Sequence, residues 1–179
     1  GQILYGLGPK CHCHLVHHSH YEALIKAQVD TDLKVLFSIR HPLGIVLSHT
    51  HWMSRGDGSD RWIHLPDDEL KEKVHTYWLN GKGRQWFSKY EGWLVPDWIY
   101  KVRYEDLRLN LKETCESIHQ YLGAEEFGSV NVWMRRLRDD SETYRKALVN
   151  EWRDRFTGQL LDDLVEELEP FIIRYGYSI

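Results

Sequence analysis

Arg40 and Ser48 are spaced as residues that hold a phosphate group would be. Arg40 follows an apolar run at 34–39 that is typical of a buried strand, and Ser48 lies about two turns into the helix that Pro42 opens. In open parallel sheets, ligands bind beyond the carboxyl ends of the strands, where a helix start offers free N–H groups and a positive dipole end. A guanidinium, a hydroxyl and a helix start together suit a phosphate, although a surface arginine and a helix serine without a ligand fit the same pattern.

Two later segments carry groups that suit the same kind of ligand. Tyr104 follows a second strand-like run at 98–103, where its ring can stack on a purine; a core tyrosine is the alternative. Arg145 and Lys146 are adjacent cations in a segment with little periodicity, and a solvated run of charge is the alternative there. Beside Arg40, these two cations would complete a site for a dianion, because charge-assisted hydrogen bonds to phosphate are strong.

The segment 10–20 contains five histidines and two cysteines, and it supports three interpretations. One histidine could act as a general base, because its pKa lies near working pH. The segment could instead bind a metal ion or be a solvated stretch without a site. The possible metal ligands are Cys11, Cys13, His14, His17 and His18. Of the three interpretations we favour the general base, and we expect no metal.

Composition narrows the class of protein. The chain has 179 residues, 42% of them apolar and 28% charged, so we expect one globular domain over 1–179. A net charge of −4 lacks the basic excess of a nucleic-acid binder, and no run approaches the roughly 20 apolar residues that span a bilayer. No signal peptide is evident, and three cysteines argue against a disulfide framework and favour a reducing, cytoplasmic location. Nothing in the sequence indicates an oligomeric state.

The order strand, helix, strand, helix predicts an α/β fold with a parallel sheet covered by helices. Only two strands are evident, and sheets usually hold about five, so we expect that an N-terminal portion is missing. A last helix is expected from a cap at Thr157, and Asn110 with Glu113 has the spacing of a capping box. The other helices are expected at 42–55, from 67 or 68 to 78, around 86–93, at 110–122 with Gly123 as its end, and at 129–138.

The three segments, in this order, resemble the nucleotide-binding elements of the sulfotransferase family. The family pattern Arg-(Asp/Asn)-Pro-x-Asp-x-x-x-Ser is matched at Arg40 and Ser48, and Arg-(Tyr/Phe)-Glu-Asp-Leu is matched at 103–107. The family pattern Arg-Lys-Gly-x-x-Gly-x-Trp-(Lys/Arg)-x-x-Phe-Thr is met by Arg145, Lys146, Trp152, Arg153, Phe156 and Thr157. The similarity covers roughly residues 10 to 177.

The resemblance implies a three-layer fold related to P-loop proteins and a sulfuryl donor, 3′-phosphoadenosine-5′-phosphosulfate, which leaves as adenosine 3′,5′-bisphosphate. The acceptor would be a hydroxyl or an amine that attacks sulfur in line, so positioning and cationic stabilisation dominate. Tyr104 would lie near the adenine. The 3′-phosphate would be held by Arg40, Ser48, Arg145, Lys146 and Ala147.

The same resemblance points to the base among the histidines. His14 and His12 stand in contexts like those of the family's base, and we favour His14, then His12, while His18 fits the usual spacing best. The polar loop 56–66 is a possible substrate gate or a plain connector. Trp52, Trp62 and Trp86 could shape an acceptor pocket, and ordinary core or surface aromatics are the alternative.

Departures from the family pattern bear on activity. The phosphosulfate loop, a Pro-Lys-x-Gly-(Thr/Ser)-(Thr/Ser) sequence, is absent, and Pro9-Lys10 matches it poorly, so we expect no turnover by these 179 residues alone. Gly44 stands where the family pattern has an acidic residue. Ala147 stands where the family pattern has a glycine whose N–H approaches the phosphate. A degenerate nucleotide-binding or protein-binding domain is one alternative. A P-loop-type kinase is another, which the absence of Gly-x-x-x-x-Gly-Lys-(Ser/Thr) disfavours.

Overall fold

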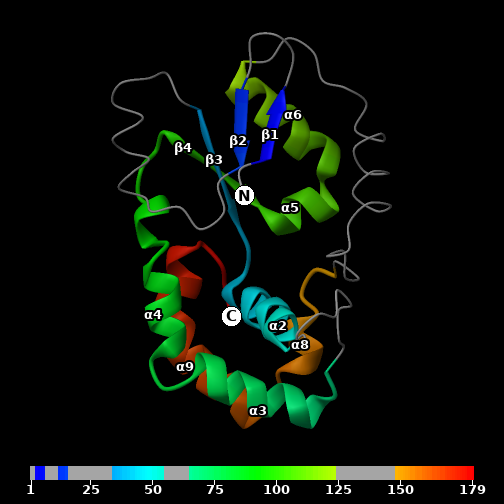
Figure 1. Ribbon diagram of the computed structural model, residues 1–179, viewed down its shortest axis with the longest axis vertical. Coiled ribbons are helices and arrows are strands. Elements are labelled where there is room, and N and C mark those ends of the chain that lie inside the picture. The colour runs from blue at the N-terminus through cyan, green and yellow to red at the C-terminus, as the bar shows by residue number, and fades with distance from the viewer. Residues whose placement is uncertain (1–2, 7–11, 16–33, 55–64, 124–147) are drawn as a thin grey trace. The chain divides into compact units, whose positions relative to one another are not determined.

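The first 33 residues form a compact unit of their own, separate from Lys34–Ile179. The computed structural model describes residues 3–6, 12–15, 34–54, 65–123 and 148–179 (Figure 1). In the first unit, β1 (Ile3–Gly6) and β2 (His12–Leu15) pair antiparallel. The sequence analysis missed both strands, because four residues are too few to show a clear period. The single domain expected over 1–179 stays a prediction.

The second unit is built on a parallel pair of strands. β3 (Val35–Ile39) and β4 (Ile99–Arg103) run in register, from Val35 opposite Ile99 to Ile39 opposite Arg103. Parallel strands need a long crossover, and here it carries α2 (Pro42–Met53), α3 (Asp67–Trp78), α4 (Lys82–Ser88) and the short 3₁₀ helix η1 (Glu91–Trp93). The α/β class is confirmed, whereas the three-layer sheet and the relation to P-loop proteins stay predictions.

Four helices follow β4 in the described residues. They are α5 (Tyr104–Leu109), α6 (Leu111–Leu122), α8 (Trp152–Arg155) and α9 (Gln159–Arg174). α6 ends at Gly123, whose φ of 66° is left-handed, as the sequence predicted. The expected helix at 129–138 lies outside the described residues, as do most of the loop 56–66 and Trp62.

Three details of the predicted helices are wrong. α9 is capped by Gly158 rather than Thr157, because the chain turns there at φ 55° and ψ −141°, a conformation that essentially only glycine adopts. Asn110 caps α6 by position, but its side chain makes no capping hydrogen bond, so the capping box does not form. The helix expected around 86–93 is instead α4, which begins at Lys82, followed by η1.

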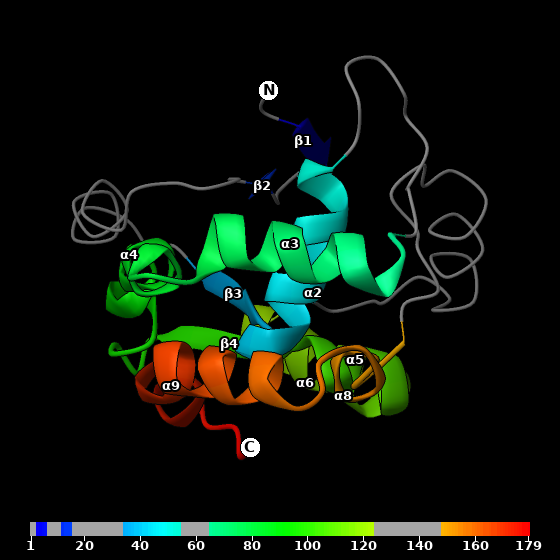
Figure 2. The same cartoon turned by 90° about the horizontal axis from the view of Figure 1, so that it is seen from below.

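The hydrophobic core surrounds α2, which packs against α3, α8 and α9. Figure 2 shows α2 and α3 together, with α9 on the other side of α2. Leu43, Val46 and Leu47 are fully buried on α2, and the buried indole of Trp78 donates a 2.9 Å hydrogen bond to Thr50 Oγ1. α2 is therefore a central helix, held on several sides, and its first turn has a fixed position relative to β3.

A buried carboxylate joins α4 to α9. Glu167, on α9, accepts hydrogen bonds from the backbone N–H groups of Gly81 at 3.2 Å and Arg84 at 3.0 Å, so it caps the start of α4. Gly83 allows the close approach, because a Cβ there would lie 2.7 Å from the carbonyl oxygen of Trp78 and 2.9 Å from Leu168. This joint fixes the crossover between the two strands.

Candidate functional site

The register of the strand pair brings Arg40 and Tyr104 together. Ile39 and Arg103 are opposite each other, so the next residue of each strand leaves the same edge of the sheet. The guanidinium carbon of Arg40 lies 4.3 Å from the centre of the Tyr104 ring, which is a cation–π contact. Two residues that the sequence analysis selected from separate segments thus meet at the carboxyl ends of the strands, where α/β proteins bind ligands.

The Arg40 side chain also lies against the first turn of α2. Gly44 is the third residue of α2, and a Cβ added to it would be 3.1 Å from Arg40 Nε. Ser48 is four residues further on, so it lies one turn along the same helix face as Gly44. The half-buried Ser48 hydroxyl and the Arg40 guanidinium are therefore carried by neighbouring turns, as a shared ligand would require.

His41 caps α2 with its side chain. Its Nδ1 accepts a 3.2 Å hydrogen bond from Leu43 N–H, and its Nε2 lies 3.2 Å from the carbonyl oxygen of Ser178. These two bonds assign the proton of the neutral imidazole to Nε2. Burial lowers the pKa of His41, and the charges of Arg153 and Arg40 lower it further, against the raising effects of the Ser178 bond and Glu105. The cap is thus a neutral imidazole in place of the Asp or Asn of the family pattern.

The end of the chain closes over this edge in what we call the C-terminal clasp, made of Arg103, Glu105, Gly176, Tyr177 and Ser178. Tyr177 O–H donates a 2.5 Å hydrogen bond to Glu105 Oε2, while Glu105 Oε1 accepts the backbone N–H of His41 at 3.2 Å. Arg103 donates from Nη2 to the carbonyl oxygen of Gly176 at 2.9 Å and lies 4.8 Å from the centre of the Tyr177 ring.

Burial, together with the bond to Glu105, raises the pKa of Tyr177 well above its usual value, so the phenol stays protonated and donates. From the sequence, Tyr177 was expected only to be part of the family-like end. No local pattern links it to Glu105, because the contact arises only where the C-terminus meets the strand ends.

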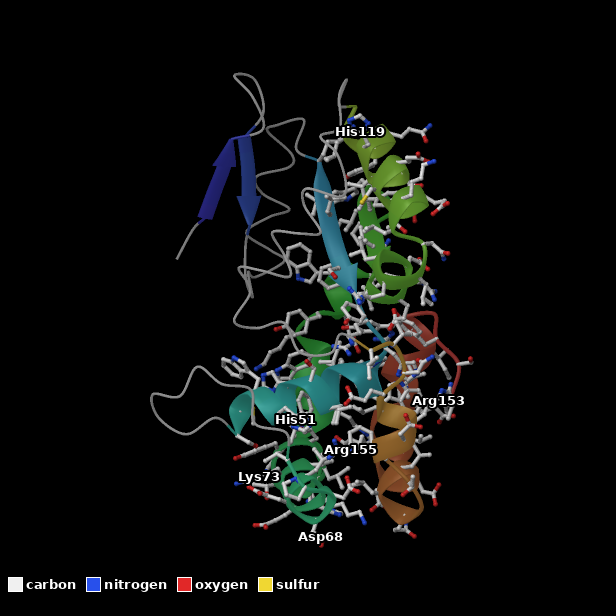
Figure 3. All side chains as sticks on the ribbon, turned by 90° about the vertical axis from the view of Figure 1, so that its right-hand side faces the viewer. His51, Asp68, Lys73, His119, Arg153 and Arg155 are labelled. Atoms are coloured by element: carbon white, nitrogen blue, oxygen red, sulfur yellow. The ribbon has the colours of Figure 1, made fainter. Side chains whose placement is uncertain are left out.

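The third segment reaches the same place through Trp152. Its indole, on α8, stacks on the His41 imidazole with the ring centres 4.5 Å apart, and the Arg153 guanidinium lies 4.4 Å from the indole centre. Arg155, labelled in Figure 3, holds α8 to the start of α3. It donates hydrogen bonds to Asp67 Oδ1 at 2.8 Å and to the Leu65 carbonyl oxygen at 2.6 Å. Part of the family-like C-terminal pattern therefore converges on the segment that begins with Arg40.

The other selected residues lie outside the described residues or in the first unit. Arg145, Lys146 and Ala147 lie outside the described residues, as does His18. His12 and His14 lie in β2, where their backbones pair with Gly6 and Leu4. The roles suggested for these residues stay predictions.

An aromatic group surrounds His49 on α2. The imidazole centre lies 5.4 Å from Trp52, 5.3 Å from Trp78 and 5.7 Å from Trp86. Trp78 is part of the core, whereas half of the Trp52 surface is exposed. The sequence left open whether Trp52 and Trp86 are core aromatics or line an acceptor pocket, and their contacts here fit either.

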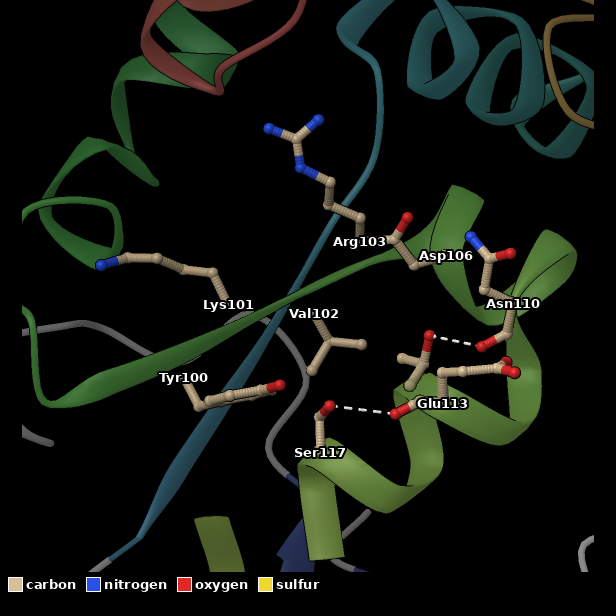
Figure 4. A pocket seen from close by; sticks show the side chains of 9 residues that line it. Tyr100, Lys101, Val102, Arg103, Asp106, Asn110, Glu113 and Ser117 are labelled. Carbon is tan, nitrogen blue, oxygen red and sulfur yellow. Dashed lines mark hydrogen bonds between the residues drawn. The ribbon is translucent and has the colours of Figure 1, made fainter. Parts of the chain in front are cut away.

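A separate open cavity of about 400 Å³ lies between β4 and the polar side of α6 (Figure 4). Its hydroxyls are engaged by the helix itself, since Thr114 Oγ1 donates to the Asn110 carbonyl oxygen at 2.8 Å and Ser117 Oγ to that of Glu113 at 2.9 Å. The cavity is lined by Tyr100, Lys101, Val102, Arg103, Asp106, Asn110, Glu113, Thr114 and Ser117. This cavity was not predicted from the sequence.

In a comparison with known families, the model of the sulfotransferase domain matches residues 10–137. The matched span includes Arg40, Ser48 and Tyr104 and ends before Trp152. No curated protein matches the chain at a significant level. Among the described residues, no group of three or more His, Cys, Asp or Glu side chains is placed to hold a metal ion. None of the described helices is long and apolar enough to cross a bilayer.

Proposed function

The chain belongs to the sulfotransferase family, and on that premise we propose that it forms a large part of an enzyme that takes the sulfuryl group from 3′-phosphoadenosine-5′-phosphosulfate and transfers it to a hydroxyl or an amine. Turnover would also need the phosphosulfate loop that these 179 residues lack. The observation that carries the proposal is the meeting of Arg40 with Tyr104 at the strand ends, next to the α2 face that bears Ser48. In this proposal the donor binds beyond the carboxyl ends of β3 and β4.

The chain's own groups fit the 3′-phosphate of such a donor. Arg40 offers a planar fork of N–H donors beside the positive end of α2, and Ser48 offers a hydroxyl one turn further along. Arg145, Lys146 and the backbone of Ala147 would supply the remaining charge and N–H groups. Because the 3′-phosphate is remote from the sulfur, these residues act by binding and positioning, and they raise the rate by fixing the donor for in-line attack.

Tyr104 has two tasks in this proposal. Its ring supports the Arg40 guanidinium at 4.3 Å, which limits the orientations of the fork. Its remaining surface is where the adenine would lie. Glu105, half-buried within the clasp, keeps α5 in place, because both of its carboxylate oxygens accept hydrogen bonds, from His41 N–H and from Tyr177 O–H.

His14, with His12 as the second candidate, would take the proton from the acceptor hydroxyl or amine. As that proton leaves, the acceptor oxygen or nitrogen forms its bond to sulfur. The bond between sulfur and the bridging phosphate oxygen breaks, and adenosine 3′,5′-bisphosphate departs with the electron pair. A neutral histidine is needed at the start, so activity should fall as the pH drops below the pKa of that residue.

Thermal unfolding with nucleotides tests the proposal. A ligand that binds only the folded chain, at one hundred times its Kd, stabilises it by about 2.7 kcal/mol and should raise the Tm by roughly 5–10 °C. We expect this shift with adenosine 3′,5′-bisphosphate and not with ATP. The shift should vanish in Arg40→Gln and persist in Arg174→Gln, a matched control whose arginine pairs with Glu91 instead.

Each other outcome has a definite meaning. A shift with ATP alone would favour a kinase-type nucleotide site. The absence of any shift would overturn the proposed donor and leave a domain of this family without nucleotide binding.

A further inference from the structure

A second pair of residues follows the Arg40–Tyr104 pair at the strand ends. His41 comes directly after Arg40, and Glu105 comes directly after Tyr104. The backbone N–H of His41 donates a 3.2 Å hydrogen bond to Glu105 Oε1, so the Glu105 side chain joins α5 to the start of α2. This bond lies one residue beyond the 4.3 Å contact between the Arg40 guanidinium and the Tyr104 ring. Glu105 therefore sets the spacing between the two backbone segments that carry this contact.

The Glu105 carboxylate is itself held by Tyr177. The Tyr177 O–H donates a 2.5 Å hydrogen bond to Glu105 Oε2. Burial, and then this bond, raise the pKa of Tyr177 well above its usual value, so the phenol remains a donor at every working pH. A glutamate side chain has several rotamers, and a bond from a fixed donor selects one of them. Tyr177 therefore selects the orientation in which Glu105 reaches His41.

The Tyr177 phenol has a fixed place because its backbone closes α9. The N–H of Tyr177 donates to the Ile172 carbonyl oxygen at 3.0 Å, across Gly176, whose φ of 74° is left-handed. Ile172 and Leu168 are fully buried, so the end of α9 is anchored in the core. A Cβ on Gly176 would lie 2.8 Å from Arg103 Nη2, so the close turn needs glycine.

The Tyr177 ring is also held by its two neighbours in space. The Arg103 guanidinium lies 4.8 Å from the ring centre, and the centre of the His41 ring lies 5.0 Å from it. Arg103 is fixed in turn by its 2.9 Å bond to the Gly176 carbonyl oxygen. The direction of the phenol toward Glu105 is therefore set by the fold, and a ligand does not have to order it.

We propose that Tyr177 is a positioning residue for the nucleotide site and acts through Glu105 on the Arg40–Tyr104 pair. This rests on the proposed function, because it gives the C-terminal clasp a share in the binding of adenosine 3′,5′-bisphosphate. Tyr177 does not contact the nucleotide in this scheme. It holds the segments that follow β3 and β4 at one spacing, so the Arg40 guanidinium stays over the Tyr104 ring and is ready to bind.

NMR of the full chain, with arginine labelled with carbon-13 and nitrogen-15, gives a readout that needs no ligand. Protons that lie over an aromatic ring are shifted upfield, so the Arg40 side-chain signals report its place over Tyr104. These signals are assigned by their loss in Arg40→Gln. Tyr177→Phe keeps the ring and removes the hydroxyl, so it should move the Arg40 signals toward those of an exposed arginine.

Tyr175→Phe is the matched control. It removes a hydroxyl two residues earlier, from a buried ring that lies against Phe87 in the core. It should leave the Arg40 signals in place. A general loosening of the end of α9 would move the Arg40 signals in both variants, whereas the proposed role moves them only in Tyr177→Phe.

Isothermal titration calorimetry measures nucleotide affinity in the same variants. Tyr177→Phe should bind adenosine 3′,5′-bisphosphate about three- to tenfold more weakly than the natural chain, an effect of the size found between residues of one hydrogen-bond network. Tyr175→Phe should bind it as the natural chain does. In a Glu105→Ala background, Tyr177→Phe should have no further effect, because the residue through which it acts is gone.

The outcomes separate this inference from the proposed function. If the natural chain binds the nucleotide and Tyr177→Phe binds it equally well, the inference is wrong and the nucleotide site stands. If the Arg40 signals move in Tyr177→Phe but the natural chain binds no nucleotide, the proposed donor is wrong and Tyr177 still positions Arg40. Unmoved Arg40 signals in Tyr177→Phe, equal effects of Tyr175→Phe, or an undiminished effect in the Glu105→Ala background would each overturn the inference.

Discussion

The Arg40 guanidinium lies 4.3 Å from the centre of the Tyr104 ring, and this contact joins the carboxyl ends of β3 and β4. Arginine side chains have many rotamers, and a partner that fixes the guanidinium reduces the entropy lost on ligand binding. The Tyr104 ring at the start of α5 therefore limits the orientations of the Arg40 guanidinium before a ligand binds.

Replacing Tyr104 tests whether its ring positions the Arg40 guanidinium. Tyr104→Leu removes the ring, whereas Tyr104→Phe keeps it and loses only the hydroxyl. A cation–π contact contributes roughly 0.5–2 kcal/mol, so the leucine variant should bind adenosine 3′,5′-bisphosphate about two- to thirtyfold more weakly than the phenylalanine variant. Isothermal titration calorimetry measures both. Equal affinities of the two variants would show that the ring does not position Arg40.

The imidazole cap of α2 should make stability depend on pH. Burial lowers the pKa of His41 in the folded chain below its ordinary value of 6.5, so the unfolded chain takes up its proton first as the pH falls. The stabilisation is therefore complete above about pH 6.5 and is lost as the pH falls toward the lower folded pKa. Protonation would also place an N–H on Nδ1, where the Leu43 N–H now donates.

His41→Asn isolates that effect among the 11 histidines of the chain. Asparagine is a strong helix cap that does not titrate between pH 5 and 8. The variant should therefore lose less stability than the natural chain as the pH falls through this range. Urea unfolding at pH 7.5, 6.5 and 5.5 gives the slope of the unfolding free energy against pH for the natural chain and for the variant. Parallel slopes would show that His41 does not contribute to the pH dependence.

Much of the candidate site was open to prediction because it depends on local chemistry. The apolar run before Arg40 and the proline after it define a strand end and a helix start, and the structure places β3 and α2 there. Gly123 was predicted as a helix end, and the left-handed turn at that residue confirms it. Strand and helix signals of this kind arise from neighbouring residues, so the sequence alone can show them.

The remainder depends on contacts between distant segments. Histidine is not a preferred cap, so nothing near His41 indicates that it caps α2; the burial and the Ser178 bond that hold it come from the C-terminus. The Tyr177–Glu105 bond and the Trp152–His41 stack have the same origin. The cap of α9 was missed for a different reason, since the threonine before Gly158 is the better cap by type but the backbone needs glycine.

The buried Glu167 should be important for stability although it lies away from the site. Glu167→Ala leaves the N–H groups of Gly81 and Arg84 without their acceptor at the start of α4. Hydrogen bonds to charged groups contribute about 1.5–3 kcal/mol, so the free energy of unfolding should fall by about that amount. Glu169→Ala, at an exposed position of the same helix, should change it by less than about 0.5 kcal/mol. Equal effects would contradict a capping role.

Close packing at Gly83 makes the sharpest prediction about the fold. Within a helix, alanine is favoured over glycine by up to about 1 kcal/mol, so propensity alone predicts that Gly83→Ala, in the first turn of α4, stabilises the chain. The structure predicts the reverse, because the new methyl group would lie 2.7 Å from the Trp78 carbonyl oxygen and 2.9 Å from Leu168 Cδ2. Overpacking of this kind costs about 1–3 kcal/mol, and here one of the obstructing atoms belongs to the backbone, which moves less readily than a side chain.

Chemical unfolding should therefore show that Gly83→Ala is less stable than the natural chain. Gln85→Ala, two residues later and exposed in α4, also introduces alanine but shortens a solvent-facing side chain, so it should leave stability unchanged or slightly higher. If Gly83→Ala stabilised the chain as Gln85→Ala does, the contact between α4 and α9 would be looser than the structure has it. The packing of α4 against α9, which fixes the crossover between β3 and β4, would then need another explanation.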